Sequence, residues 1–226
     1  MKKLISLCLA MTMLLGSMVG CGKTPTSSSG NPSNSEGGGL GTPQTFKFGL
    51  TVASPHPYSI AAQNFAELVE EKSGGNMTVD LYYDSSLGDD AALMESMQMN
   101  AVTFALVGPA GIAPMCPIYE FFDLPCLFAT RDAAYAFQES EPVLELMDSL
   151  SANGLRGLGF YENGYYAISN NAKEITTVDG LNNLKLRSMT SEMAIKSWEC
   201  LNVQPVAMAF GELFMAMQTG TVDGQE

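Results

Sequence analysis

The sequence is poor in basic residues and in histidine. Lys and Arg together number 11 against 24 Asp and Glu, which gives a formal net charge of −13 and an isoelectric point near 4.4. Neither nucleic acid nor an anionic membrane surface suits such an acidic chain, so neither is expected as a partner. His56 is the single histidine and no CxxC pair occurs, which excludes a histidine-rich metal site. We therefore expect no metal and no cofactor.

The motifs of common enzymes are also missing. The sequence has no GxSxG, no HExxH, no P-loop and no GxGxxG after a strand. A serine–histidine triad would need His56, which stands between two prolines in a loop. Neighbouring carboxylates such as Asp89 and Asp90 are typical of solvated helix ends. We therefore expect a protein that is not an enzyme.

The apolar run at the N-terminus, residues 4–19, is too short to span a bilayer comfortably. It follows Lys2 and Lys3 and ends at Gly20-Cys21, so residues 1–21 resemble a bacterial lipoprotein signal peptide with Cys21 as the lipidated residue. An uncleaved anchor helix or an ordinary secretory signal is the alternative. Residues 22–44 are almost free of apolar side chains and predict a flexible tether with a reach of roughly 25 Å. The folded part is then extracytoplasmic and anchored to the membrane by lipid.

Only three cysteines remain beyond Cys8 and Cys21, namely Cys116, Cys126 and Cys200. An odd number in an exported protein leaves at least one free thiol. A bridge between Cys116 and Cys126 is compatible with the sequence, but buried free thiols are the interpretation that we favour.

The folded part opens with alternating strand and helix patterns. Strands are expected at residues 46–52, 79–83 and 102–107, and helices at 57–73 and 91–100, which predicts a parallel sheet flanked by helices. Two amphipathic helices (131–139 and 142–152) and a strand (155–161) follow. The polar stretch 171–179 marks a composition shift, so we place an N-terminal α/β domain at 45–168 and a partial second α/β domain at 169–226. That second unit is expected to hold strands at 184–187 and 203–206, helices at 191–201 and 211–219, and a last strand or turn at 221–226.

Arg187 stands near the end of the strand pattern that begins at Leu184. Leu184 and Leu186 alternate with Lys185 and Arg187, and a helix pattern follows at once. Ligands of open α/β sheets collect at this end of the strands, and a guanidinium there fits a carboxylate bidentately. The spacing alone also fits an arginine on a solvated strand face, because arginine is mostly exposed.

Several blocks of the sequence resemble one specific family. The run from Gln204 to Phe214, followed by Met217-Gln218-Thr219-Gly220 and by residues 222–226, is similar to the solute-binding subunits of tripartite ATP-independent periplasmic (TRAP) transporters, the dicarboxylate-binding type. The blocks Leu87-Gly88-Asp89-Asp90 and 122–128 match further, and the resemblance covers residues 46–226.

The resemblance implies a two-domain periplasmic-binding-protein-like fold (type II-like), with parallel or mixed sheets flanked by helices, that closes on a small organic acid. Arg187 would form a salt bridge with the ligand carboxylate, and Phe210 would cover the ligand. Thr51, Asp90, Gly108 and Thr190 fall at positions that line the cleft in similar proteins. The partners implied are the organic acid and the membrane subunits of a TRAP transporter.

The sequence departs from this family at two points. Where the family often has a second arginine after Asn-Gly, this chain has Tyr165 and Tyr166. We predict that Tyr166 meets the ligand in place of that arginine; the alternative is that Tyr166 packs in the hinge and does not meet the ligand. The family also continues beyond Gln225-Glu226 with helices that complete both domains, so the second domain is expected to be incomplete. Such a fragment is expected to bind poorly or to be unstable.

Two other classes of protein stay open on the sequence. An exported hydrolase would place a pair of carboxylates face to face in the cleft, whereas a receptor would place an arginine opposite an aromatic ring. A structural or adhesive lipoprotein would have no closed cleft.

Overall fold

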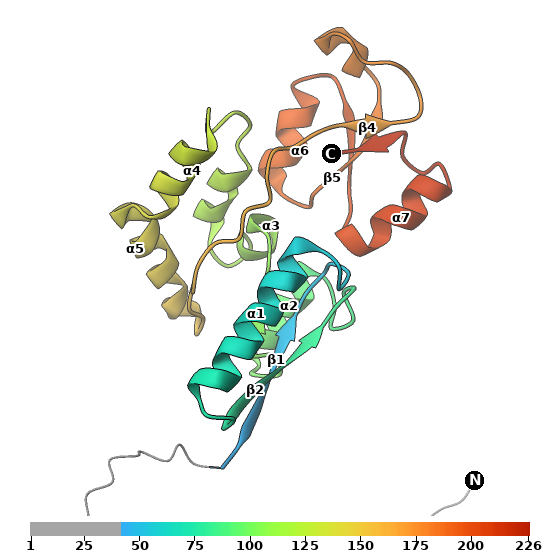
Figure 1. The fold of residues 1–226 in the computed structure, drawn as a ribbon. Helices are drawn as coiled ribbons and strands as arrows, with labels where there is room; N and C mark the ends of the chain where they lie inside the picture. The colour runs from blue at the N-terminus through green and yellow to red at the C-terminus, as the bar shows by residue number, and fades with distance from the viewer. Residues whose placement is uncertain (1–41) are drawn as a thin grey trace, which may run out of the picture. The chain divides into compact units, whose positions relative to one another are not determined.

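The computed structural model describes residues 42–226, which fold into two small sheets flanked by helices (Figure 1). The predicted signal peptide and most of the predicted tether lie outside these residues. The predicted α/β class is confirmed. The domain boundary predicted at 168/169 falls where β4 begins and stays a prediction. None of the helices within 42–226 is long and apolar enough to cross a membrane.

The first sheet has the order β2-β1-β3 and is parallel throughout. Its core forms around Phe48 and Leu50, against which Ala62 and Phe65 of the first helix pack. The elements of this half are β1 (Gln44–Gly49), α1 (Pro57–Lys72), β2 (Met77–Tyr82), α2 (Asp90–Gln98) and β3 (Phe104–Ala105). The alternation of apolar residues therefore predicted the strands and helices of this half, although β3 is shorter than expected.

Helix α1 begins as its sequence requires. The Nδ1 atom of His56 accepts a hydrogen bond from the backbone N–H of Tyr58 at 3.2 Å, and Pro57 stands in the first turn, where no backbone N–H is needed. The single histidine is therefore a helix cap.

Helical segments then connect the two sheets. They are α3 (Pro109–Ile112), the 3₁₀ helix η1 (Pro117–Asp123), α4 (Arg131–Gln138), α5 (Glu141–Ser149) and η2 (Leu150–Asn153). The sequence predicted α4 and α5. It treated residues 121–125 as an apolar loop, whereas the structure extends η1 through Asp123.

The strand predicted at 155–161 is wrong. No strand is present between Gly154 and Ile168, and the chain runs from η2 to β4 without a ladder partner (Figure 1). Leu158 is 67 % exposed, so its alternating pattern does not reflect a buried sheet face. An isolated extended segment cannot form inter-strand hydrogen bonds, and periodicity alone cannot reveal whether a neighbour exists.

The second sheet has the order β4-β7-β5-β6 and is mixed, because β4 runs antiparallel to β7. Leu181, Leu184, Leu186 and Val203 form its core. The elements are β4 (Ser169–Asn170), η3 (Val178–Leu181), β5 (Lys185–Ser188), α6 (Glu192–Glu199), β6 (Gln204–Ala207), α7 (Phe210–Gln218) and β7 (Gly224–Gln225). The strands and helices predicted here are confirmed, and the final segment is a short strand beside β5.

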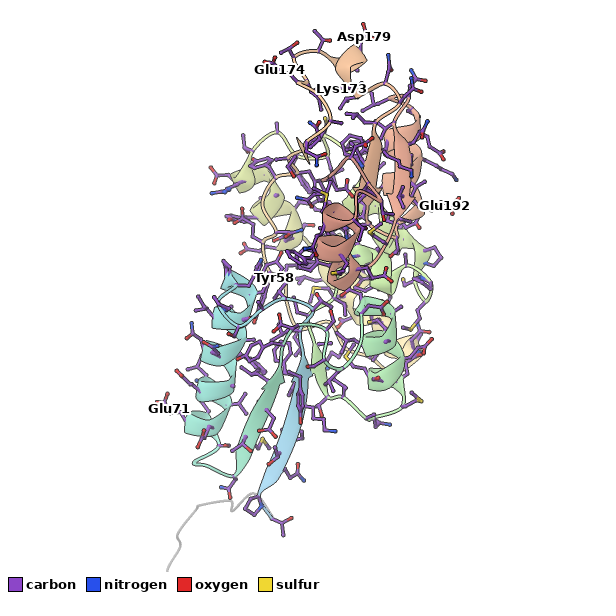
Figure 2. The ribbon with its side chains drawn as sticks, turned by 90° about the vertical axis from the view of Figure 1, so that its right-hand side faces the viewer. Tyr58, Glu71, Lys173, Glu174, Asp179 and Glu192 are labelled. Carbon is purple, nitrogen blue, oxygen red and sulfur yellow. The ribbon has the colours of Figure 1, made fainter. Side chains whose placement is uncertain are left out.

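The acidic side chains that dominate the net charge lie mainly on the outside. Glu71, Glu174, Asp179 and Glu192 are exposed and point outward (Figure 2). Cys116, Cys126 and Cys200 are all free thiols, which agrees with the favoured interpretation. The expectation that they are buried is wrong: Cys116 is half-buried and the other two are exposed, because Cys126 lies in the loop after Pro125 and Cys200 lies at the end of α6.

Candidate functional site

A single cavity brings together all seven residues that the sequence predicted for the ligand site. Its volume is about 1820 Å³. The residues come from both halves of the described chain and are Thr51, Asp90, Gly108, Tyr166, Arg187, Thr190 and Phe210. Thr51, Gly108, Thr190 and Phe210 each follow shortly after a strand, so the cavity forms where the carboxyl ends of the strands meet.

Arg187 is held firmly at the wall of this cavity. It is the third residue of β5 and only 6 % exposed, so it does not lie on a solvated strand face. Its Nε and Nη2 atoms donate hydrogen bonds to the carbonyl oxygen of Met208, at 3.3 and 3.2 Å. Burial lowers the pKa of Arg187, while the nearby groups of Glu226, Tyr166 and Asp90 raise it. The guanidinium stays cationic, because its ordinary pKa lies far above neutral pH.

Asp90 joins two segments of the cavity wall. Its Oδ2 atom accepts a hydrogen bond from the backbone N–H of Gly108 at 3.0 Å. A Cβ atom at Gly111 would lie 2.7 Å from the Cβ of Asp90, so the close approach of α3 to α2 requires glycine there. Burial raises the pKa of Asp90, and the bond from Gly108 opposes that effect. One oxygen of the Asp90 carboxylate therefore already accepts a hydrogen bond from within the protein.

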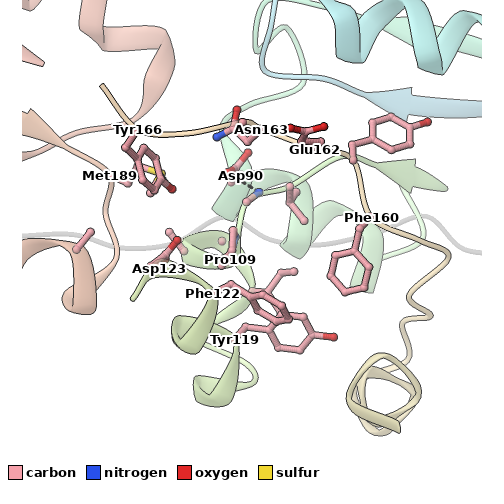
Figure 3. A pocket seen from close by; sticks show the side chains of 18 of the residues that line it. Asp90, Pro109, Tyr119, Phe122, Asp123, Phe160, Glu162, Asn163, Tyr166 and Met189 are labelled. Atoms are coloured by element: carbon pink, nitrogen blue, oxygen red, sulfur yellow. Dashed lines mark hydrogen bonds between the residues drawn. The ribbon is translucent and has the colours of Figure 1, made fainter. Parts of the chain in front are cut away.

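Tyr166 and Phe210 are two of the predicted site residues that remain exposed. Tyr166 is 55 % exposed and Phe210 is 51 % exposed. Within residues 42–226 the Tyr166 hydroxyl has one hydrogen bond, to the Sδ atom of Met189 at 3.8 Å, and the two side chains lie together in Figure 3. Its pKa is nevertheless raised, first by loss of hydration at the hydroxyl end and then by Asp123 and Glu226. The ring thus faces open space, while the hydroxyl lies near the acidic part of the cavity.

Aromatic side chains form another part of the wall. Tyr119 and Phe122 have ring centroids 5.9 Å apart, and Phe122 lies 5.7 Å from Phe160 (Figure 3). All three rings line the cavity. This wall suits the apolar part of a ligand, because burying apolar area is favourable by about 25 cal/mol per Å².

Sequence reasoning missed two carboxyl groups of the cavity, Asp123 and Glu226. The two oxygens of Glu226 accept hydrogen bonds from the Ser188 hydroxyl (3.0 Å), the Met189 backbone N–H (2.9 Å) and the Trp198 indole N–H (2.5 Å). These donors fix Glu226 beside β5. No local sequence pattern indicates this contact, since its partners lie at least 28 residues away.

Asp123 is buried, with 5 % exposed, and neither of its oxygens accepts a hydrogen bond from the described residues. Burial is the main cause that raises its pKa to about 6. The feature of the sequence that could have revealed this buried carboxyl is that Asp123 stands between two apolar residues, Phe122 and Leu124.

Residues 42–226 contain no group of three or more His, Cys, Asp or Glu side chains arranged to hold a metal ion. In the part of the chain that is described, two guanidiniums line the cavity, those of Arg187 and Arg131, and Arg131 is paired with Glu162 at 2.9 Å.

Known proteins show the same fold and related sequences. The C4-dicarboxylate-binding periplasmic protein DctP of Rhodobacter capsulatus is 34 % identical over 192 residues, which are 83 % of this chain and 56 % of that protein. The C4-dicarboxylate-binding protein DctB of Bacillus subtilis is 31 % identical, over 83 % of this chain and 54 % of its own length. The chain thus spans about half the length of these curated relatives.

Among solved structures, the sugar acid binding protein of Advenella mimigardefordensis in complex with galactonate matches with a TM-score of 0.80 and 35 % identity, over 81 % of this chain and 59 % of that one. A TRAP periplasmic solute binding protein of Shewanella oneidensis with bound succinate matches with a TM-score of 0.77 and 31 % identity, over 81 % and 60 %. The model of the bacterial extracellular solute-binding proteins, family 7, matches residues 48–226. With its two-sheet α/β fold and a match over most of its length, this chain belongs to family 7 of the bacterial extracellular solute-binding proteins.

Proposed function

We propose that the protein is an extracytoplasmic receptor that binds a small organic acid by its carboxylate and delivers it to the membrane subunits of a TRAP transporter. The observation that carries this proposal is the placement of Arg187. Its guanidinium is buried at the wall of a large cavity and oriented by the Met208 carbonyl.

The chemistry of Arg187 fits this role. A guanidinium has five N–H donors, and the Met208 carbonyl occupies only part of them. The remaining donors can form a bidentate pair with a carboxylate, an interaction that strengthens where water is excluded. The Met208 bonds fix the plane of the fork before the ligand arrives, which reduces the ordering that binding requires.

An exported hydrolase is the alternative from another class. A hydrolase would need two carboxylates that are free to act on a substrate. Among the cavity carboxylates, Asp123 and Glu226 are the candidates for such a pair. Glu226 accepts hydrogen bonds from Ser188, Met189 and Trp198, and Asp90 accepts one from Gly108. The arrangement therefore favours a receptor over a hydrolase, as does membership of a solute-binding family.

For the ligand we propose a monocarboxylate in preference to a C4 dicarboxylate. Tyr166 offers a ring and a hydroxyl where the family resemblance implies a second guanidinium. The other guanidinium that lines the cavity, Arg131, is already paired with Glu162 at 2.9 Å, so a second ligand carboxylate would lack a free cationic partner. The Tyr119, Phe122 and Phe160 rings favour a ligand with an apolar portion. The solved relatives include proteins crystallised with galactonate and D-erythronate, which carry one carboxylate, and with succinate and L-malate, which carry two.

We also propose that Cys21 is lipidated and that residues 22–44 tether the receptor to the outer side of the cytoplasmic membrane. The support is the apolar run that ends at Gly20-Cys21 and the polar segment that follows.

Phe210, Thr51 and Thr190 remain proposed ligand contacts, because each lines the cavity with an exposed or half-buried side chain.

The test is carried out on a full-length version of the protein and on variants of it, because the fragment is expected to bind poorly. It uses a panel of acids: galactonate, erythronate, succinate, malate and lactate. A ligand that binds only the folded protein raises its melting temperature, and calorimetry then gives the affinity. Arg187→Ala should abolish binding of every acid that the wild type binds, because the ligand charge is left unpaired. Arg156→Ala is the matched control, since Arg156 is exposed and does not line the cavity. Unchanged binding by the Arg187→Ala protein would refute the proposal.

A further inference from the structure

Asp123 is the one buried side chain among residues 42–226 whose polar atoms meet no partner within hydrogen-bond geometry, although the Ser191 hydroxyl lies close enough to lower its pKa. It ends η1, lines the cavity and is 95 % shielded from solvent. Its carboxyl group points toward the part of the cavity where Tyr166 and Met189 lie (Figure 3). Buried polar groups are normally bonded, so this carboxyl must be explained by something other than packing.

The neutral form of Asp123 is favoured in this environment. A buried carboxylate without a partner is costly, whereas a protonated carboxyl has no charge to desolvate. Burial raises the pKa of Asp123 to about 6, the Ser191 hydroxyl opposes part of that shift, and Glu226 and Glu120 add to it. Near neutral pH the Asp123 carboxyl can therefore be either protonated or ionised.

The charged groups around Asp123 are mostly acidic. Glu120 is on the same 3₁₀ helix, Glu226 follows β7, and the Tyr166 hydroxyl comes from the segment before β4. Helix α6 contributes Ser191 at its start, and its Glu192 and Lys196 side chains pair with each other on the surface at 2.5 Å. Helix α3 contains no titratable side chain.

Asp123 and the proposed carboxylate site act on the same hydroxyl. Asp123, Tyr166 and Arg187 line the same cavity, and the pKa of Tyr166 is raised by Asp123 and lowered by Arg187. A ligand carboxylate bound at Arg187 would therefore lie in the electrostatic field of an ionised Asp123. The repulsion acts in both directions: the bound anion favours a proton on Asp123, and the proton favours the anion.

We propose, on the basis of the receptor function above, that organic-acid binding is coupled to protonation of Asp123, whose neutral form is the high-affinity state. Asp123 acts as a positioning residue that sets the charge of the cavity rather than as a direct ligand of the acid. Ligand affinity should then fall as the pH rises through the range in which free Asp123 loses its proton, and binding near neutral pH should take up protons.

The experiment is calorimetry from pH 5.5 to pH 8 with the acid of the panel that binds most tightly. We expect affinity to fall by up to about tenfold per pH unit above pH 6. Near pH 7, the observed enthalpies in two buffers of different ionisation enthalpy should reveal proton uptake. The Asp123→Asn protein should lose both the slope and the uptake, while Asp132→Asn, which changes an exposed carboxylate, should keep them.

The wild-type measurements alone can overturn the proposal, whether or not the Asp123→Asn protein folds. A flat pH profile without proton uptake would refute it and leave the receptor function intact. The same slope in Asp123→Asn would assign the proton to another carboxyl, such as Asp90, and refute it equally. Absence of binding by the wild type at every pH would overturn this inference together with the proposed function.

Discussion

The Arg187 guanidinium donates two hydrogen bonds to the backbone carbonyl oxygen of Met208, at 3.3 Å from Nε and 3.2 Å from Nη2. The two residues belong to neighbouring strand ends, because β5 pairs with β6 and Met208 directly follows β6. The parallel register thus positions the guanidinium fork at the cavity wall. A backbone carbonyl orients the fork without neutralising it, so its positive charge remains available to a ligand anion.

This geometry predicts that Arg187→Lys restores only part of the binding. An ammonium supplies charge but cannot bond Met208 and hold a carboxylate bidentately at the same time. We expect affinity for the tightest panel acid to fall about ten- to hundredfold, the range for a lost hydrogen bond between charged groups. Calorimetry on the Lys protein, with Arg156→Lys as control, measures the loss. Wild-type affinity in the Arg187→Lys protein would contradict the bidentate contact.

Tyr166→Arg should shift preference from monocarboxylates toward succinate and malate. The new guanidinium would supply the second cation that a dianion requires. Tyr166→Phe is the matched control and should change selectivity little, because within residues 42–226 the hydroxyl has one hydrogen bond, to Met189 Sδ at 3.8 Å. Competition binding between lactate and succinate distinguishes these outcomes. If succinate or malate already outcompetes the monoacids on the wild type, the selectivity proposal is wrong.

Asp123 should make folding stability depend on pH in a defined direction. Its folded-state pKa of about 6 lies above the ordinary value of 3.8, so the native protein binds more protons than the unfolded chain between these values. The contribution of Asp123 to the free energy of unfolding should therefore be fully present below about pH 4 and be lost as pH rises through about 6. The shift sets an upper limit of about 3 kcal/mol, which screening by water in the cavity reduces to on the order of 1–2 kcal/mol.

Urea unfolding of ligand-free protein at pH 4.5, 6 and 8 measures this dependence. The Asp123→Asn protein should lose less stability than the wild type between pH 4.5 and pH 8, because its amide does not ionise. Comparing pH values within each protein removes the constant effect of burying an amide. Parallel pH profiles for the two proteins would show that Asp123 titrates normally.

Cys21→Ala should release the protein from the membrane fraction or block its processing. The prediction rests on the apolar run that ends at Gly20-Cys21 and on the polar tether that follows. Fractionation of cells that produce the wild type and the variant, with Cys8→Ala as control, measures the anchoring. Equal membrane association of Cys21→Ala and the wild type would indicate an uncleaved helix instead of a lipid.

Sequence alone determined the features that depend on local periodicity and on position along a strand. Alternating side chains predicted β1, β2 and β5, the helical stripes predicted α1, α2 and α6, and the segment after Leu184 placed Arg187 at a strand end. All seven predicted site residues line one cavity. Position along a strand predicted only Arg187 among them, whereas the other six were predicted from the resemblance to the solute-binding family.

Tertiary structure alone decided which segments meet. Periodicity predicted a strand at 155–161, but no partner strand lies beside it within residues 42–226, so it does not form a ladder. The burial of Asp123, the bonds from Ser188 and Trp198 to Glu226, and the Met208 carbonyl under Arg187 all join residues far apart in the chain. Pairing and desolvation depend on every neighbour in space, and a local sequence pattern contains no record of those neighbours.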